Sequence, residues 1–105
     1  MTDNKAGGLL GIARRAGLLS AGHDAALGAI QNGSACLCLL AADASARLQA
    51  EMERAAARFS PNAATVRGTF TMQELGKTIG AKPTAVLTVN DAGFAARIQD
   101  HIGRE

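Results

Sequence analysis

Two apolar segments constrain the fold of this chain more than any other feature of its sequence. Residues 36–41 and residues 85–89 contain no charged side chain, and both have the length of a β-strand. Continuous apolar runs of this length are typical of central strands that are covered on both faces. Such a sheet needs helices on each side, so the remaining segments should supply them.

Segments with helical spacing alternate with these strands. Helices are expected at residues 4–16, at residues 23–31 and, after a cap at Asp43 or Ser45, up to the break at Pro61-Asn62. Their inward positions are Leu9, Ile12, Ala13 and Ala16, then Leu27 and Ile30, then Leu48, Met52, Ala55 and Phe59. A separate polar face of the third helix is interpreted as a solvated surface with internal ion pairs, formed by Arg47, Arg54 and Arg58 interleaved with Glu51 and Glu53.

The same alternation continues to the end of the chain. Extended pieces are expected at residues 18–20 and 63–67, and Thr71 with Glu74 has capping-box spacing that opens a short helix through Ile79. Asn90 or Asp91 should cap a last helix whose inward positions are Phe94, Ile98 and Ile102. The order predicts a single α/β domain over residues 1–105, with a core of about residues 4–103, folded as a three-layer α/β/α sandwich.

The composition and charge of the chain limit the classes of function that it could have. Eleven basic and nine acidic residues give a net charge of +2. Dedicated binders of double-stranded nucleic acid usually have a stronger basic excess, so RNA binding would be confined to a local surface. No apolar run approaches the ~20 residues that span a membrane, and the first residues lack the plan of a secretory signal. A cytoplasmic protein without membrane association is expected.

Residues that could carry catalysis or hold a metal are few. Cys36 and Cys38 lie two residues apart on a strand and are interpreted as buried thiols, because a zinc site would need further ligands. His23 and His101 are the only histidines, and no nucleophile or phosphate-loop motif occurs. Asp24 beside His23 is interpreted as a carboxylate in the first turn of a helix. We therefore expect no enzymatic activity, no cofactor and no metal.

Two segments remain as candidate binding sites. Residues 20–24 present a helix N-terminus after Gly22, and free backbone amides at such an end bind phosphates or base edges. Residues 80–85 form a stiff loop of small residues with one lysine, Lys82.

An ordered series of short motifs links these segments to a known family. The motifs are LLGIARRAG (residues 9–17), SAG (20–22), AI (29–30) with Gly33, LLAADAS (39–45), ELGKTIG (74–80), KP (82–83) and DAGF (91–94). Together they resemble the bacterial YlxQ-like branch of the kink-turn RNA-binding ribosomal-protein superfamily, of the archaeal L-seven-Ae and L-thirty-e type.

This resemblance implies an α/β/α sandwich with a mixed four-stranded sheet and a non-catalytic RNA-binding function. The implied partner is structured RNA such as an rRNA or mRNA element, with an association with the ribosome or a translation factor and a monomeric state. The helix that starts near residue 23 would enter the RNA, and the loop before the last strand would cover a flipped-out base. The implied RNA-binding residues are Gly22, His23, Asp24, Ala25, Gly28, Lys77, Lys82, Pro83, Thr84 and Ala85.

The sequence departs from the family pattern at one motif. The family carries Gly-x-Asn-Glu-x-x-Lys at the start of this helix, and Gly22 matches, whereas Asp24, Ala25 and Gly28 replace the Asn, the Glu and the Lys. The missing Lys removes a phosphate contact, and Asp24 adds a charge that phosphates repel. A protein-interaction module that keeps the scaffold without kink-turn affinity is therefore a second hypothesis beside RNA binding.

Overall fold

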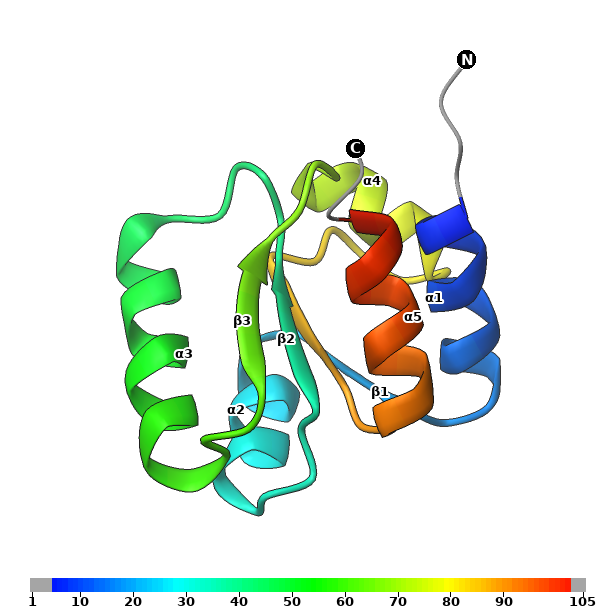
Figure 1. Ribbon diagram of the computed structural model, residues 1–105. Helices are drawn as coiled ribbons and strands as arrows, with labels where there is room; N and C mark the ends of the chain where they lie inside the picture. Colours follow the sequence, from blue (N-terminus) through cyan, green and yellow to red (C-terminus); the bar gives the residue numbers. More distant parts are fainter. Residues whose placement is uncertain (1–4, 103–105) are drawn as a thin grey trace.

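The computed structural model describes residues 5–102 and places a sheet between two layers of helices (Figure 1). The strands are β1 (Leu19–Ala21), β2 (Leu37–Leu40), β3 (Ala64–Arg67) and β4 (Val86–Val89). The helices are α1 (Lys5–Arg15), α2 (His23–Gln31), α3 (Ala46–Phe59), α4 (Met72–Thr78) and α5 (Ala92–Ile102). α2 and α3 cover one face, α1 and α5 cover the other, and α4 lies at one end (Figure 1). The predicted α/β/α sandwich is confirmed.

Some predicted boundaries lie outside the described residues. These are residue 4, where the first helix was expected to begin, and the limits of the predicted domain and core at both ends of the chain. Within the described part, α2 has the bounds that the sequence predicted. The other elements begin and end within a residue or two of the prediction.

The sheet is mixed, as the resemblance implied. Its strand order is β1-β4-β2-β3. β2 pairs with β3 in parallel, with Leu37 opposite Ala64, while β4 runs antiparallel to both β1 and β2. The two apolar runs therefore form the two central strands, and every residue of β2 and β4 is buried.

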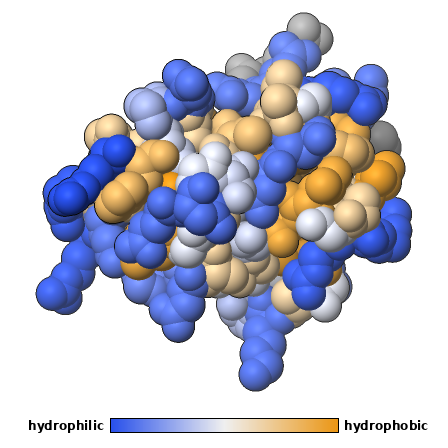
Figure 2. Space-filling view, turned by 90° about the horizontal axis from the view of Figure 1, so that it is seen from below, coloured by the Kyte–Doolittle hydropathy of each residue, from blue (hydrophilic) through white to orange (hydrophobic). Residues whose placement is uncertain are grey.

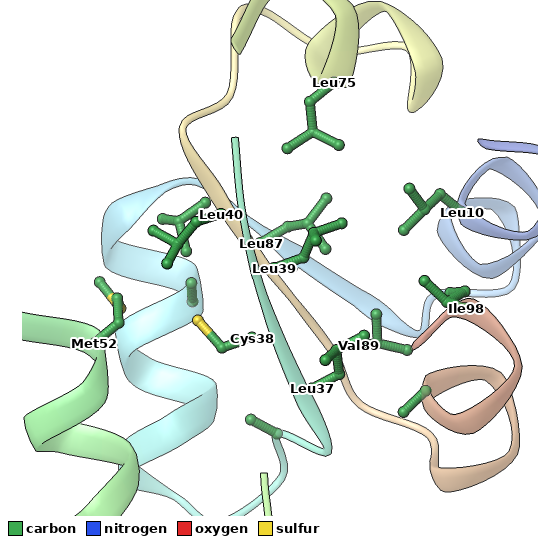
Figure 3. Packing of buried hydrophobic residues seen from close by; sticks show 14 of the residues in the cluster. Leu10, Leu37, Cys38, Leu39, Leu40, Met52, Leu75, Leu87, Val89 and Ile98 are labelled. Atoms are coloured by element: carbon green, nitrogen blue, oxygen red, sulfur yellow. The ribbon is translucent and has the colours of Figure 1, made fainter. Parts of the chain in front are cut away.

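The two faces of the central strands carry different side chains (Figure 3). Large aliphatic side chains point toward α1, α4 and α5, namely Leu37, Leu39, Leu87 and Val89, where Leu10, Leu75 and Ile98 meet them. The opposite face carries Leu40 and Val86 as well as Cys38 and Thr88, which are partners across the ladder, and Cys38 points toward Met52 of α3. Burying one large aliphatic side chain contributes about 1.5–3 kcal/mol, so both faces stabilise the fold and the first face, which carries more of these side chains, contributes more.

Two side chains fix the start of α3. Ser45 caps the helix, because its Oγ accepts a hydrogen bond of 3.0 Å from the Leu48 amide. Asp43, the other predicted cap, instead accepts a hydrogen bond of 2.8 Å from the Met72 amide and so ties the β2–α3 connection to α4. The capping function predicted for this segment thus belongs to Ser45.

Arg67 holds the same connection from the end of β3. Its guanidinium donates to the carbonyl oxygens of Ala41, Ala42 and Ala44 at 3.1, 3.0 and 2.7 Å. It also donates to Oε1 of Gln49 from Nε at 3.1 Å and from a terminal nitrogen at 2.6 Å. These bonds satisfy carbonyls at the turn and fix the first turns of α3 against the sheet.

The caps of α4 and α5 agree with the sequence. Thr71 and Glu74 form the predicted capping box, with Oγ1 of Thr71 accepting from the Glu74 amide at 3.1 Å and Oε1 of Glu74 accepting from the Thr71 amide at 2.9 Å. Asp91 rather than Asn90 caps α5, because its Oδ2 accepts from the Phe94 amide at 2.9 Å.

Three predicted inward positions are wrong. Ile12 is 48% exposed and Ala16 is also exposed, because α1 turns Ala6, Leu9, Leu10 and Ala13 to the core and Ile12 lies about 200° round the helix from Leu10. Phe59 is 42% exposed, because it is the last residue of α3, where the chain turns away toward β3. The guanidinium of Arg58 lies 5.2 Å from its ring centroid.

Candidate functional site

The start of α2 is shaped by a glycine. Gly22 is the N-cap, with φ at +95°, a value that side chains other than glycine rarely adopt. Its amide donates to the Val86 carbonyl at 2.9 Å, which joins the turn to β4. Because glycine offers no capping side chain, no side chain accepts a hydrogen bond from the first turn of α2 at its cap. Backbone amides therefore dominate this helix end.

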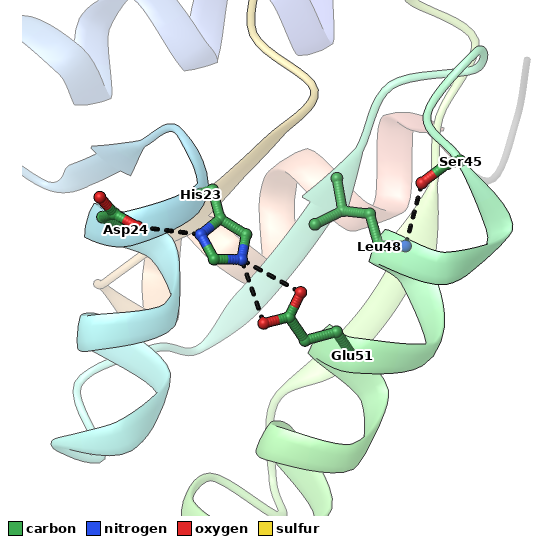
Figure 4. A network of polar contacts seen from close by, with 5 residues as sticks. All are labelled: His23, Asp24, Ser45, Leu48 and Glu51. Atoms are coloured by element: carbon green, nitrogen blue, oxygen red, sulfur yellow. Dashed lines mark hydrogen bonds and ion pairs between the residues drawn. The ribbon is translucent and has the colours of Figure 1, made fainter.

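His23 connects the first turn of α2 to α3 (Figure 4). Its Nδ1 lies 2.9 Å from Oδ1 of Asp24, and its Nε2 lies 3.0 and 3.1 Å from the two carboxylate oxygens of Glu51. The hydrogen bond with Asp24, and then the hydrogen bond and the charge of Glu51, raise the pKa of His23 above its ordinary value of 6.5. Carboxylates only accept hydrogen bonds, so both contacts are made at once by the doubly protonated ring.

The loop before β4 packs tightly against α4. Gly76 allows the close approach, because a Cβ atom at this position would lie 2.1 Å from the Lys82 carbonyl oxygen. The Ala81 amide donates to the Gly76 carbonyl at 2.7 Å, and the Thr84 amide donates to the Met72 carbonyl at 2.9 Å. The loop is therefore fixed in place by α4 rather than free in solvent.

Within this loop, side chains divide into supporting and exposed ones. Thr84 is buried, and its hydroxyl donates to the Lys82 carbonyl at 2.7 Å, so it supports the loop from inside. Lys82 and Pro83 are exposed, and Ala85 is half-buried. These exposed side chains are the ones that a ligand would meet.

The structure brings most of the sequence-predicted residues together. The bond from Gly22 to Val86 places the start of α2 beside the end of the loop, because Ala85 directly precedes Val86. Asp24 and Ala25 are exposed on the first turns of α2. Gly28 is half-buried one turn further, and a Cβ added there would meet no atom within 4 Å. We call this set, residues 22–28 with residues 82–85, the α2–loop surface.

Lys77 lies on α4 rather than on α2 or on the loop before β4. It is an exposed residue in the last turn of α4, and its carbonyl accepts a hydrogen bond of 3.2 Å from the Gly80 amide. Glu51 was not among the predicted site residues, although it contacts His23 directly. The two residues are 28 positions apart, and no local spacing signals such a contact.

The cysteines differ from each other. Cys38 is buried as predicted, and burial raises the pKa of its thiol to about 12, so the thiolate is not formed near neutral pH. Cys36 is only half-buried, which corrects the prediction of two buried thiols, and its Sγ lies 3.7 Å from the Ser34 carbonyl oxygen.

Among residues 5–102, no group of three or more His, Cys, Asp or Glu side chains could hold a metal ion. No helix in the same range is both long and apolar enough to cross a membrane.

Comparisons with known proteins agree with this fold. The model of the ribosomal protein L7Ae/L30e/S12e/Gadd45 family matches residues 4–98. The chain therefore belongs to this family. A search of curated proteins found no match.

Two solved structures illustrate the similarity. A Bacillus halodurans C protein with unknown function superposes with a TM-score of 0.86 at 29% sequence identity, over 96% of this chain and 99% of that one. A Giardia lamblia protein, described as a 15.5kD RNA binding protein, superposes with a TM-score of 0.71 at 17% identity, over 99% of this chain and 92% of that one. The second likeness is one of fold alone.

Proposed function

We propose that this protein is a non-catalytic RNA-binding protein that recognises structured, kink-turn-like RNA through the α2–loop surface. The observation that carries the proposal is the hydrogen bond from the Gly22 amide to the Val86 carbonyl. It holds an N-terminal helix end, which attracts phosphates, beside a rigid loop that exposes Lys82 and Pro83. Family membership supports the same function, and the chain shares its fold with the Giardia lamblia protein that is described as RNA binding.

The cellular setting is part of the proposal. A family of ribosomal proteins favours a cytoplasmic protein of the YlxQ-like type, associated with the ribosome or a translation factor and bound to an rRNA or mRNA element as a monomer. Neither a cofactor nor a metal takes part in this function. The residues proposed to touch RNA are Gly22, His23, Asp24, Ala25, Gly28, Lys77, Lys82, Pro83 and Ala85, while Thr84 supports the loop.

A protein-interaction module is the second candidate, and one observation favours it. α2 contains no lysine or arginine, and its first turn carries Asp24, which is fully exposed. A surface of this kind offers little attraction to phosphates. On the face shown in Figure 2, hydrophobic areas lie between hydrophilic residues, a mixture that is typical of protein surfaces in general and does not separate the two candidates.

A gel-shift experiment separates the two candidates. A kink-turn RNA is titrated with the protein beside the same RNA whose kink has been removed by mutation. RNA binding predicts a shifted band with the kink-turn RNA at a lower protein concentration than with the mutated one. Equal binding to both RNAs would remove the kink-turn specificity from the proposal, and no binding to either would favour the protein-interaction module.

A further inference from the structure

Three arginines line one side of α3. Arg54 lies seven residues after Arg47, and Arg58 lies eleven residues after Arg47. At about 100° per residue, the three side chains project within about 40° of one another around the helix. The row extends over about 16 Å of the helix axis. All three residues are exposed. We call Arg47, Arg54 and Arg58 the arginine stripe.

Within residues 5–102, the arginine stripe lacks the ion pairs that its sequence predicted. Among the contacts of the described residues, no carboxylate lies within ion-pair distance of Arg47, Arg54 or Arg58, which corrects the expected pattern of internal pairs. Arg58 contacts the ring of Phe59, a contact that neutralises no charge. Because Arg54 and Arg58 are four residues apart, their like charges also repel each other along the helix. Among the described residues, the stripe is thus a row of three positive charges without a direct ion pair.

The acidic residues that could neutralise the stripe are engaged elsewhere. Glu51 lies between Arg47 and Arg54 in sequence, yet its carboxylate binds His23 at 3.0 and 3.1 Å (Figure 4). Glu53 projects about 120° away from Arg47 around the helix, and it accepts a hydrogen bond of 3.2 Å from Gln49. Because the Glu51 carboxylate binds His23, it does not form an ion pair with the arginines on either side of it.

The same contact fixes where the stripe lies. Because His23 is the first residue of α2 and Glu51 sits within the row of arginines, the stripe borders the start of α2. α2 has no lysine or arginine of its own. An anionic partner at the α2–loop surface would therefore find its nearest row of guanidinium groups on α3, and guanidinium groups bind phosphates in a bidentate manner.

We propose that the arginine stripe binds the phosphate backbone of the RNA that occupies the α2–loop surface. This inference rests on the proposed function and extends it to a second helix. Phosphate contacts set affinity and position, whereas base contacts set specificity. The stripe accordingly supplies general affinity, and the start of α2 with the loop supplies recognition.

The test compares two variants that lose the same charge. One is the stripe variant Arg47→Gln, Arg54→Gln, Arg58→Gln. Its matched control is Arg14→Gln, Arg15→Gln, Arg97→Gln, which removes three exposed arginines from α1 and α5 on the opposite side of the sheet. Binding of the kink-turn RNA is measured over a salt series. The stripe variant should lower the log–log salt slope by about 2–3 units, since each lost phosphate contact lowers it by about 0.7–0.9, and the control should lower it by less than about one unit.

A charge-preserving variant distinguishes a loss of phosphate contacts from a loss of folding. Arg47→Lys, Arg54→Lys, Arg58→Lys should keep most of the salt slope, because lysine also binds phosphate as a point charge. A stripe variant that binds RNA like its matched control would overturn the inference and leave the proposed function intact. If the wild-type protein binds no RNA, both fail. Stripe-dependent binding of a polyglutamate peptide in that case would assign the row to an acidic protein partner.

Discussion

The two faces of the sheet differ in what they bury. Toward α1 and α5 the strands present leucine and valine side chains, which pack on Leu10 and Ile98 (Figure 3). Toward α2 and α3 the strands present Leu40 and Val86 but also Thr88, whose hydroxyl donates to Oδ1 of Asn90 at 2.9 Å. The Asn90 amide in turn donates to the Ser20 hydroxyl at 2.9 Å, so this face contains a chain of polar contacts.

This difference separates stability from function within a small domain. The α1/α5 layer consists of large aliphatic contacts, which stabilise the fold and require no particular surface chemistry. α2 packs on β1 and β4 and buries two small residues, Ala26 and Ala29, beside the larger Ile30, and it carries the candidate site on its exposed side. Substitutions in the first layer should therefore change the free energy of unfolding, while substitutions on the outside of the second should change binding.

The largest expected change in stability comes from α3, where one residue faces the core and the residue before it faces solvent. Met52→Asp should unfold the domain, because an unpaired buried carboxylate costs several kcal/mol against a total stability of about 5–15 kcal/mol. Glu51→Ala, one residue away, should change stability by about 0.5 kcal/mol or less. Thermal melts followed by circular dichroism check both, and similar melting temperatures would show that the inner side of this helix has been assigned wrongly.

The next prediction compares the loss of unfolding free energy on the two faces of the sheet. Ile98→Ala should lower the free energy of unfolding by about 2–5 kcal/mol, because it opens a cavity among large aliphatic side chains. Cys38→Ala on the opposite face should cost about 1 kcal/mol, because it removes a single buried sulfur atom. Urea denaturation measures both values, and a larger loss for Cys38→Ala would reverse the comparison.

Local patterns explain why much of the scaffold could be predicted from the sequence. The capping box of Thr71 and Glu74 depends on residues three apart, and the buried strands depend on short apolar runs. The exposure of Ile12 could not be predicted in this way, because the spacing of α1 is compatible with two adjacent apolar faces and only packing chooses between them. The strand order likewise depends on contacts between distant segments.

The candidate site was predictable in part. Gly22 and Lys82 stand in segments that the sequence singled out, and the bond from Gly22 to Val86 brings those segments together. The contact between His23 and Glu51 joins two helices whose separation in sequence carries no periodic signal. The unpaired state of the arginine stripe follows from that contact, which is why the sequence alone favoured internal ion pairs.

The third prediction concerns binding on the outer side of the α2/α3 layer. The triple change Asp24→Asn, Ala25→Glu, Gly28→Lys restores the family residues and raises the net charge of this helix by one unit. The space beside Gly28 is open, so a lysine can be accommodated. Kink-turn affinity should increase, with about 1–3 kcal/mol of discrimination for each bidentate base contact regained. Gly28→Ala serves as a control for helix stability alone, and an unchanged affinity of the triple variant would place the RNA contacts elsewhere.

The smallest expected effect is a pH dependence of stability from His23. Its pKa is raised above 6.5 in the folded protein by Asp24 and Glu51, so the folded state binds the proton more tightly than the unfolded state does. This stabilisation is fully present below pH 6.5 and is lost as the pH rises through the folded pKa. Melting temperatures of the wild type should therefore fall relative to those of His23→Gln between about pH 6 and about pH 8. Parallel curves for the two proteins would show that the contacts of His23 do not stabilise the fold.

An NMR titration of the labelled protein with a kink-turn RNA tests the central claim most directly, because it locates the binding surface residue by residue. The account predicts that the largest shift changes of backbone amides fall on residues 22–28 and 82–85, while residues of α1 and α5 change little. Shift changes concentrated on α1 and α5, with the start of α2 unaffected, would contradict it.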